Sequence, residues 1–226
     1  TGLYFVQHGP DGHAFSYLRR GSAASLMTPA LLQSGLIERS RFLHVSGISM
    51  AISTSACDTV FAAIARAHAA GAQVSLDSNL RLRLWPVDRA RAVLREAMRE
   101  ADVFLPSMDD MQHLTGNDDP ERTLDWIRDG GAAGVVVLKL GKDGSIIDDG
   151  RTRTPVAALR VEAVDATGAG DCFAGSLLAR RCRGDSWEDA VRYANAAAAL
   201  STLGYGAVDP LPRAEQVLER LKSLAG

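Results

Sequence analysis

The stretch VDATGAGDCFAG, residues 164–175, is the most informative part of the chain. Two glycines, Gly168 and Gly170, flank one small residue and stand directly before Asp171. Glycine allows a sharp turn of the backbone and leaves the amide N–H groups uncovered. The apolar segment that follows, residues 169–181, has the composition of a helix, so the stretch predicts a tight turn that opens into a helix N-terminus.

An anion suits this turn because the first N–H groups of a helix have no partners within it. The amides of Gly168, Ala169 and Gly170 are expected to cradle a phosphoryl group, and the helix macrodipole adds roughly 0.3–1 kcal/mol for a charge there. Asp171 in the first turn would accept a proton from an attacking alcohol, which is typically worth about 10²–10⁴ in rate. The alternative is a plain helix cap, in which Asp171 only balances the macrodipole.

Two other phosphate-binding patterns are excluded. The dinucleotide fingerprint G-x-G-x-x-G needs a glycine where Phe173 stands. The phosphate loop G-x-x-x-x-G-K-[ST] fails around Gly141 and Lys142, because Val136 occupies the place of its first glycine.

Strand and helix patterns alternate through most of the chain. Short apolar strands are predicted at residues 42–45, 73–76, 103–105 and 135–140, with helices between them and three more helices after residue 168. This alternation predicts an α/β fold with three layers and a mainly parallel sheet. Residues 145–148 and 152–156, on either side of Gly150, predict a short antiparallel addition.

The first segment departs from the alternation. Residues 3–6 and 14–18 predict the strands of a β-hairpin around the turn GPDG, residues 9–12. We expect residues 1–25 to form a partial β lid and residues 26–226 to form the α/β core. Since an isolated hairpin has open edges, a homodimer through the lid is expected.

Composition excludes several classes of protein. The chain has 226 residues, 46% of them apolar, and a formal net charge of -2, which argues against disorder and against nucleic-acid binding through bulk charge. It contains no run of about 18 apolar residues, so no membrane-spanning helix and no membrane partner are expected. Three cysteines without metal-ligand spacing and the absence of a signal-peptide pattern favour the cytoplasm.

Residues 164–175 closely resemble the D-T-x-G-A-G-D signature of the ribokinase-like (PfkB-type) carbohydrate kinases. Residues 137–144, VLKLGKDG, are similar to the family's nucleotide strand and glycine turn, and residues 193–195, YAN, to its adenine-side segment. Residues 204–210 resemble the loop that closes the nucleotide site. The resemblance implies a ribokinase-like α/β/α fold, ATP and Mg²⁺ as cofactors, and a small sugar or sugar acid as substrate.

The resemblance also assigns roles to individual residues. Asp171 is the base, and Gly168, Ala169 and Gly170 form the anion hole for the γ-phosphoryl group. The positions that match nucleotide-binding residues of the family are Asn79, Ser107, Lys139, Gly141, Gly144 and Asn195. For three of these a simpler role stays open: a cap of the next helix for Ser107, a solvated strand end for Lys139 and a helix-surface amide for Asn195.

The resemblance also suggests residues that would bind cations. Asp110 replaces the family's Glu, which organises Mg²⁺ through water, and a shorter carboxylate still suits an ion that keeps several waters. Asp165 and Thr167 match positions that hold a monovalent cation such as K⁺ in some members.

The substrate is suggested by two further stretches. Residues 77–85, DSNLRLRLW, resemble the D-x-N-x-R-x-x-L-W stretch of 2-keto-3-deoxygluconate kinases, and residues 15–23 resemble their lid strand. A guanidinium pairs bidentately with the carboxylate of a sugar acid. The matching substrate positions are Tyr17, Arg19, Arg81, Asp171 and, in the closing loop, Asp209. Asp209 has the alternative role of preceding a proline in a turn.

Members of the family are roughly 300 residues long and begin with a strand and a G-G-x-x-x-N sugar motif. Neither precedes Thr1, so the N-terminal strands of the family fold are expected to be absent and residues 1–226 alone to be weakly active or inactive. The leading hypothesis is ATP-dependent phosphorylation of 2-keto-3-deoxygluconate to its 6-phosphate. The alternatives are a ribokinase- or fructokinase-type kinase of a neutral sugar, and a non-catalytic remnant that binds a nucleotide or sugar.

Overall fold

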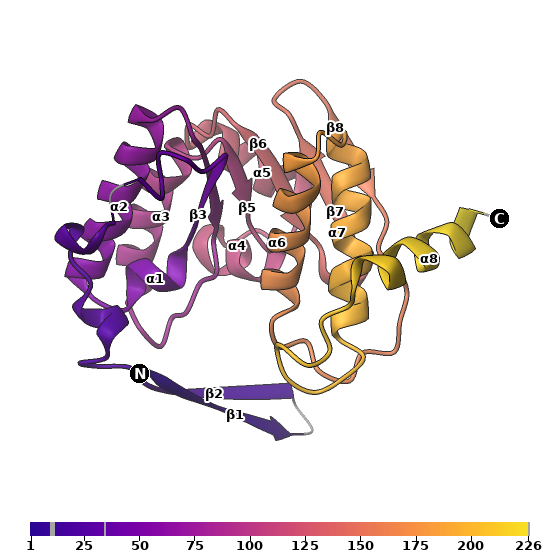
Figure 1. Cartoon of the computed structure of the whole chain (residues 1–226), viewed down its shortest axis with the longest axis horizontal. Coiled ribbons are helices and arrows are strands. Elements are labelled where there is room, and N and C mark those ends of the chain that lie inside the picture. The colour runs from indigo at the N-terminus through magenta and orange to yellow at the C-terminus, as the bar shows by residue number, and fades with distance from the viewer. Residues whose placement is uncertain (10–11, 34, 226) are drawn as a thin grey trace. The chain divides into compact units, whose positions relative to one another are not determined.

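The computed structural model describes residues 1–9, 12–33 and 35–225 (Figure 1). It contains two compact units, Thr1–Ala101 and Asp102–Gly226. We call them unit 1 and unit 2. The predicted boundary near residue 25 stays a prediction.

Unit 1 begins with the predicted hairpin. Strand β1 (Leu3–Gly9) pairs antiparallel with β2 (Gly12–Leu18), with Leu3 opposite Leu18 and Tyr4 opposite Tyr17. Two residues of the predicted turn, 10 and 11, lie outside the described residues. Leu3, Phe5 and Leu18 are 55%, 57% and 64% exposed, so the hairpin carries an open apolar surface.

The rest of unit 1 is an α/β segment. Strand β3 (Phe42–Ser46) pairs in parallel with β4 (Gln73–Asp77), and the connection contains α1 (Gly47–Ala51) and α2 (Thr54–Ala69). Helix α3 (Val87–Arg99) follows. The side chain of Ser53 caps α2 by accepting from the N–H of Ala56 at 3.1 Å. Short 3-10 turns occupy Ala23–Leu26 and Pro29–Leu31.

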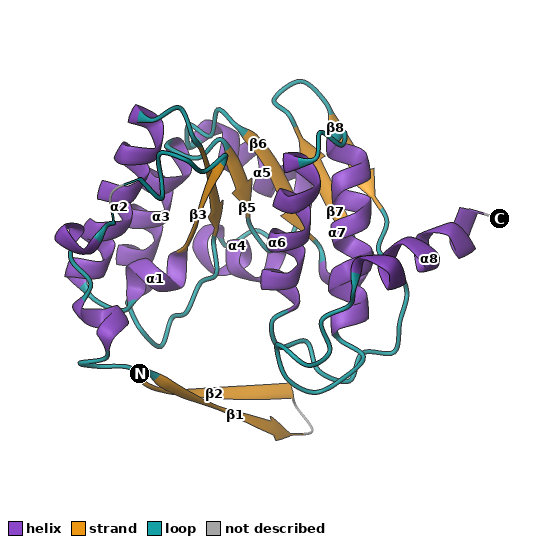
Figure 2. Ribbon diagram, viewed as in Figure 1, coloured by secondary structure: helices purple, strands orange, loops and turns teal. Residues whose placement is uncertain are grey.

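Unit 2 contains a parallel pair with an antiparallel extension. Strand β5 (Val103–Leu105) pairs in parallel with β6 (Val135–Lys139), and β7 (Ser145–Asp148) and β8 (Arg153–Val156) continue the sheet antiparallel. Its helices, shown in Figure 2, are α4 (Met108–Thr115), α5 (Pro120–Asp129), α6 (Ala169–Cys182), α7 (Trp187–Ser201) and α8 (Ala214–Ala225). A 3-10 turn, Gly141–Asp143, separates β6 from β7. Val136, Val137 and Leu138 are fully buried, which explains the continuous apolar run of β6.

A buried ion pair fastens α5 to the sheet of unit 2. Arg128 donates from Nη2 to Oδ1 of Asp148 at 2.7 Å, and from Nη1 to the carbonyls of Ala132 and Gly134 at 2.9 and 2.8 Å. Arg153 donates to the other carboxylate oxygen of Asp148 at 3.3 Å. Burial raises the pKa of Asp148, but the hydrogen bonds from Arg128, Gly150 and Arg153 outweigh it and hold that pKa below its ordinary value.

The fold prediction is confirmed in its main features. The class is α/β, both units contain a parallel strand pair, the antiparallel addition after Gly144 is present, and the hairpin is separate. Within the described residues, no helix combines the length and the apolar character that crossing a membrane requires.

Candidate functional site

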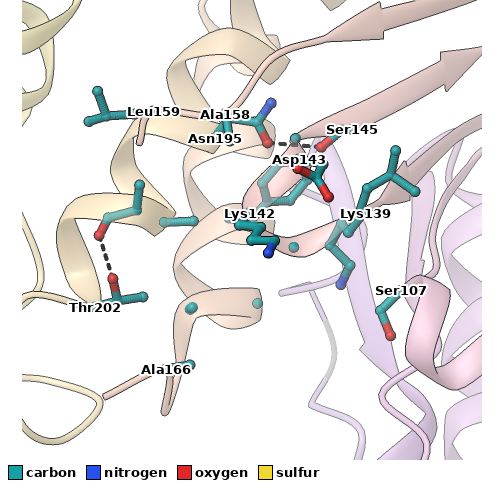
Figure 3. A pocket seen from close by; sticks show the side chains of 18 of the residues that line it. Ser107, Lys139, Lys142, Asp143, Ser145, Ala158, Leu159, Ala166, Asn195 and Thr202 are labelled. Carbon is teal, nitrogen blue, oxygen red and sulfur yellow. Dashed lines mark hydrogen bonds between the residues drawn. The ribbon is translucent and has the colours of Figure 1, made fainter. Parts of the chain in front are cut away.

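Unit 2 contains a cavity with a volume of about 720 Å³ (Figure 3). Its walls come from the end of β6, the turn 141–144, the segment 158–163 that follows β8, the start of α6 and the last turns of α7. The predicted residues that line it are Ser107, Lys139, Gly141, Gly144, Ala169, Gly170 and Asn195. Seven positions proposed separately from the sequence therefore share one cavity.

The turn into α6 opens on this cavity. Gly168 has φ +80, and a Cβ atom there would lie 2.8 Å from the Cβ of Ala207, so both conformation and space require glycine. The N–H of Ala169 donates to the carbonyl of Ala166 at 3.1 Å, so this amide is already engaged. In the described part of the chain, the N–H groups of Gly170 and Asp171 have no hydrogen-bond partner. Among the three residues expected to cradle a phosphoryl group, Ala169 thus has its amide engaged and Gly170 does not.

Asp171 stands in the first turn of α6 and is exposed. It does not line the cavity, whereas its neighbours Ala169 and Gly170 do. No hydrogen bond or ion pair to another described residue holds its carboxylate. The turn therefore contributes Gly170, whose amide is uncommitted, to the cavity lining, and it leaves the Asp171 carboxylate exposed to an incoming molecule.

Asp165 fixes the shape of this turn. It is 3% exposed, and its Oδ1 atom accepts from the N–H and the hydroxyl of Thr167 at 2.9 and 2.7 Å. Its Oδ2 atom accepts from the N–H of Gly206 at 2.9 Å. The two residues expected to hold a monovalent cation thus contact each other. Across the described residues, no group of three or more His, Cys, Asp or Glu side chains is placed to hold a metal ion.

The end of β6 supplies a positive charge. Lys139 is half-buried, lines the cavity, and its N–H donates to the carbonyl of Pro106 at 2.8 Å. Lys142 lines the same cavity, and Figure 3 shows both lysine side chains. Arg160 adds a third cation at the rim, 3.5 Å from the carboxylate of Asp143. This balance of charge suits a polyphosphate.

The turn after β6 depends on Gly144. Its φ is +100, and a Cβ atom there would lie 2.2 Å from the carbonyl oxygen of Val156. Gly141 has φ +59 with open space around it, so its requirement for glycine is conformational. Both glycines let the backbone pass close to the cavity.

Ser107 caps a helix, and its role in binding a nucleotide stays a prediction. Its hydroxyl accepts from the N–H of Asp110 at 3.2 Å and so caps α4, while the residue also lines the cavity. Asp110 itself does not line the cavity, but the neighbouring Asp109 does.

Asn195 is not a surface amide. It is 7% exposed, its Oδ1 atom accepts from the hydroxyl of Ser145 at 2.8 Å, and its Nδ2 atom donates to the carbonyls of Val156 and Ala157 at 3.1 and 3.4 Å. The helix-surface alternative for Asn195 is therefore wrong.

Sequence reasoning missed a group of lining residues, namely Asp109, Lys142, Ser145, Leu159, Arg160, Val161, Ala198, Ala199 and Thr202. The alanine run of α7 was visible in the sequence, and short side chains on a helix leave room beside it. The segment 158–163 carried no signal, because it is neither helix nor strand.

The remaining predicted residues lie elsewhere. Tyr17 on β2 and Arg19, Asn79 and Arg81 belong to unit 1. Asn79 has φ +33 and donates from its N–H to Oδ1 of Asp77 at 3.3 Å, while Arg81 donates to the carbonyl of Leu80 at 2.7 Å. Asp209 lines a second, smaller cavity of about 490 Å³ in unit 2, together with Arg213 and neighbouring prolines. The structure does not bring Asp209 into the larger cavity.

Known proteins resemble the chain over almost its whole length. A 2-dehydro-3-deoxygluconokinase from Bacillus subtilis (strain 168) is 34% identical over 227 residues, which is 99% of this chain and 69% of the relative. Fructokinase-2 from Zea mays is 36% identical over 223 residues, 94% of this chain and 66% of the relative. A double mutant of fructokinase from Vibrio cholerae O395, solved with fructose, ADP and a potassium ion, is 31% identical with a TM-score of 0.83 and covers 92% of this chain and 68% of its own.

The model of one protein family, described as pfkB family carbohydrate kinase, matches residues 1–214. This match covers both units, including the turn into α6 and the cavity beside it. The chain therefore belongs to the pfkB family of carbohydrate kinases.

Proposed function

We propose that this chain acts in the ATP-dependent phosphorylation of a sugar acid, with 2-keto-3-deoxygluconate as the acceptor and its 6-phosphate as the product. One observation carries the proposal: the turn at residues 168–171 combines two uncommitted amides, those of Gly170 and Asp171, with an exposed carboxylate, and its residues Ala169 and Gly170 line a cavity of about 720 Å³. A nucleotide in the cavity and an acceptor outside it would meet at this turn.

The reaction assigns a balanced step to these groups. The acceptor hydroxyl oxygen attacks the γ-phosphorus of ATP, and a new P–O bond forms while the bond to the β–γ bridging oxygen breaks. Asp171 takes the hydroxyl proton, and ADP leaves. The N–H groups of Gly170 and Asp171 stabilise the charge on the transferring phosphoryl group, which is where phosphoryl-transfer enzymes gain most of their rate.

Other residues of the cavity would hold the nucleotide. Lys139, Lys142 and Arg160 offer positive charge to the phosphates, and the apolar side chains of Leu159 and Val161 offer contact to a base. Asp109 lines the cavity, and Asp110 is the next residue in the chain. Two neighbouring carboxylates fit an oxygen-ligated Mg²⁺ that keeps its waters. Bound Mg²⁺ would neutralise phosphate charge during transfer.

A potassium ion is a weaker part of the proposal. Its support is that the double-mutant fructokinase from Vibrio cholerae was solved with a bound potassium ion. The Asp165 carboxylate is engaged with Thr167 and Gly206, so we expect any monovalent cation to meet backbone carbonyls of this turn rather than that carboxylate.

The acceptor is argued from charge. Arg19 and Arg81 of unit 1, with the hydroxyl of Tyr17, would recognise the carboxylate of a sugar acid. The resemblance to 2-dehydro-3-deoxygluconokinase supports this acceptor, and the similar identity to fructokinases supports a neutral hexose as the second candidate. Comparing kcat/KM for 2-keto-3-deoxygluconate, fructose and ribose tests the choice, since a clear preference for fructose or ribose would overturn the arginine–carboxylate argument.

Binding without turnover is the third candidate. Because the chain covers 69% of the length of the Bacillus subtilis relative, we expect residues 1–226 to turn over slowly. Titration calorimetry with a non-hydrolysable ATP analogue and Mg²⁺, beside an assay of sugar-dependent ADP formation, separates a slow kinase from a binding protein. Full activity of residues 1–226 would contradict the expected weakness.

A homodimer through the hairpin completes the proposal. Leu3, Phe5 and Leu18 form an exposed apolar surface on β1 and β2, which a second hairpin would cover. Leu18→Glu should shift the protein to monomer in sedimentation velocity, while Leu82→Glu, at an exposed leucine outside the hairpin, should not. An unchanged sedimentation coefficient for Leu18→Glu, or a monomeric wild type, would refute the dimer.

A further inference from the structure

The side chain of Asn195 joins three separate parts of unit 2. It projects from α7, accepts from the Ser145 hydroxyl at the start of β7, and donates to the carbonyls of Val156 and Ala157 where β8 ends. Figure 3 shows the bond to Ser145 beside the cavity. All four residues belong to unit 2, so the connection is local to the cavity wall.

The hydrogen bonds of this amide are nearly exhausted. Its NH₂ group donates to the carbonyls of Val156 and Ala157, at 3.1 and 3.4 Å, and its oxygen accepts from the Ser145 hydroxyl. The opposite orientation of the amide would aim Oδ1 at two other oxygens, so the carbonyls determine which end is which. The polar atoms of the Asn195 side chain are consequently committed to the wall of the cavity.

The hydrogen bonds of Asn195 help to position residues 158–161, which form one wall of the cavity. Residues 158–161 follow the two bound carbonyls directly and line the cavity. Leu159 is 7% exposed and packs with Ala196, Ala197 and Val217. This segment has no strand partner of its own, so the Asn195 bonds and this small core hold it against α7.

The turn at residues 141–144 lies against the end of β8, on which this cavity wall depends. A Cβ atom on Gly144 would lie 2.2 Å from the Val156 carbonyl, which is the carbonyl that Asn195 binds. The backbone of the turn 141–144 and the end of β8 are therefore in contact, and a shift of one alters the other. Both line the cavity or lie directly beside it.

We propose that Asn195 is a positioning residue that holds the segment 156–161 against α7 and so determines the width of the nucleotide cavity, without contacting the nucleotide base. This inference rests on the proposed function, because it takes the cavity to be the nucleotide site. It differs from the role suggested by resemblance, in which Asn195 touches the nucleotide.

The experiment uses residues 1–226 and three variants, Asn195→Ala, Asn195→Asp and Ser145→Ala. Calorimetric Kd values are measured for non-hydrolysable ATP and GTP analogues with Mg²⁺, and amide hydrogen exchange is followed at residues 156–161. Asn195→Ala should weaken both analogues by the same factor, about tenfold for a loss of 1.4 kcal/mol, and should speed exchange at residues 156–161. Asn195→Asp should bind no better than Asn195→Ala, because a carboxylate would face two carbonyls.

Ser145→Ala removes one of the three bonds and should give a smaller loss. The double variant Ser145→Ala with Asn195→Ala should bind as the single Asn195 variant does, because both changes act through one connection. Asp148→Asn is the matched control. It breaks a buried pair at the other end of β7, so it should lower Tm and leave both Kd values unchanged.

Three results would overturn the inference. The first is unchanged exchange at residues 156–161 in Asn195→Ala, and the second is a loss confined to one of the two analogues, which would indicate direct contact with the base. The third is an equal loss of affinity in Asp148→Asn, which would mean that stability alone matters. If the wild type binds neither analogue, the proposed function fails, and the exchange measurement still decides whether Asn195 holds the segment.

Discussion

Asp165 and Gly206 are joined by a hydrogen bond of 2.9 Å across 41 positions of sequence, from the Gly206 N–H to the Asp165 Oδ2 atom. The other oxygen of the same carboxylate binds Thr167 twice. One buried side chain therefore holds the turn into α6 and the loop at residues 203–209 together. Gly168 and Ala207 belong to the same two segments and lie so close that a Cβ atom on Gly168 would be 2.8 Å from the Cβ of Ala207.

Replacing Asp165 with Asn should loosen both segments. An amide keeps the size of the side chain, but its NH₂ group cannot accept a hydrogen bond. It would therefore face an N–H or O–H group that now donates to the carboxylate. Leaving such a buried group unsatisfied costs about 1–3 kcal/mol. We expect a lower Tm and faster amide exchange at residues 204–209. Asp209→Asn, at an exposed position of the same loop, is the control, and equal effects of the two changes would contradict the clamp.

Asp171→Asn tests the base. The amide cannot take a proton from the acceptor, so kcat for sugar-dependent ADP formation should fall by about 10²–10⁴ while the Kd of the ATP analogue stays the same. Asp118→Asn, at another exposed aspartate of unit 2, should leave both quantities at their wild-type values. A loss of less than about threefold in kcat for Asp171→Asn would remove this residue from the base role.

Gly144→Ala tests the close approach at the turn after β6. The new Cβ atom would overlap the Val156 carbonyl in a conformation with φ +100, and strained backbone of this kind alone costs about 1–3 kcal/mol. We expect a large fall in Tm and weaker binding of the ATP analogue, seen as a higher Kd. Gly175→Ala is the matched control, since it lies inside α6 with open space around it and should raise the free energy of unfolding by about 0.5–1 kcal/mol. Similar Tm values for the two variants would contradict the packing described here.

Asp148 should make the free energy of unfolding depend on pH in the acidic range. Because its pKa is held below the ordinary value of 3.8 in the folded state, its contribution is fully present above that value and is lost as the pH falls through the lower, folded-state pKa. The free energy of unfolding, measured by urea titration between about pH 7 and pH 2.5, should therefore fall less steeply in Asp148→Asn than in the wild type. Parallel pH profiles for the two proteins would refute this. Asp149→Asn is no suitable control, because the N–H groups of Thr152 and Arg151 lower the pKa of that carboxyl as well.

Much of the fold could be predicted because the relevant signals are local. The continuous apolar run of β6 reflects burial on both faces, and the glycines around α6 reflect positive φ and a close neighbour. The same locality explains why the turn at residues 168–171 could be singled out before its surroundings were known.

The site was less accessible to sequence reasoning wherever it depends on contacts between distant residues. The surroundings of Asn195 come from β7 and from the end of β8, 38 to 50 positions away, and nothing in the alanine-rich α7 indicates which side faces them. Likewise, the engagement of the Ala169 amide by Ala166 is a detail of turn geometry that a G-A-G pattern does not specify. The segment 158–163 has no periodicity, so its place in the cavity wall could only come from the structure.

The alanines of α7 also have a practical consequence. Ala198 and Ala199 line the cavity with side chains that cannot be made much smaller, whereas every larger residue would protrude into the space they leave. An engineer who wants this protein to accept an enlarged synthetic cofactor therefore has little to gain by trimming α7. The adjustable surface is the segment that packs against α7, at Leu159 and Val161, where shortening a branched side chain would open new volume.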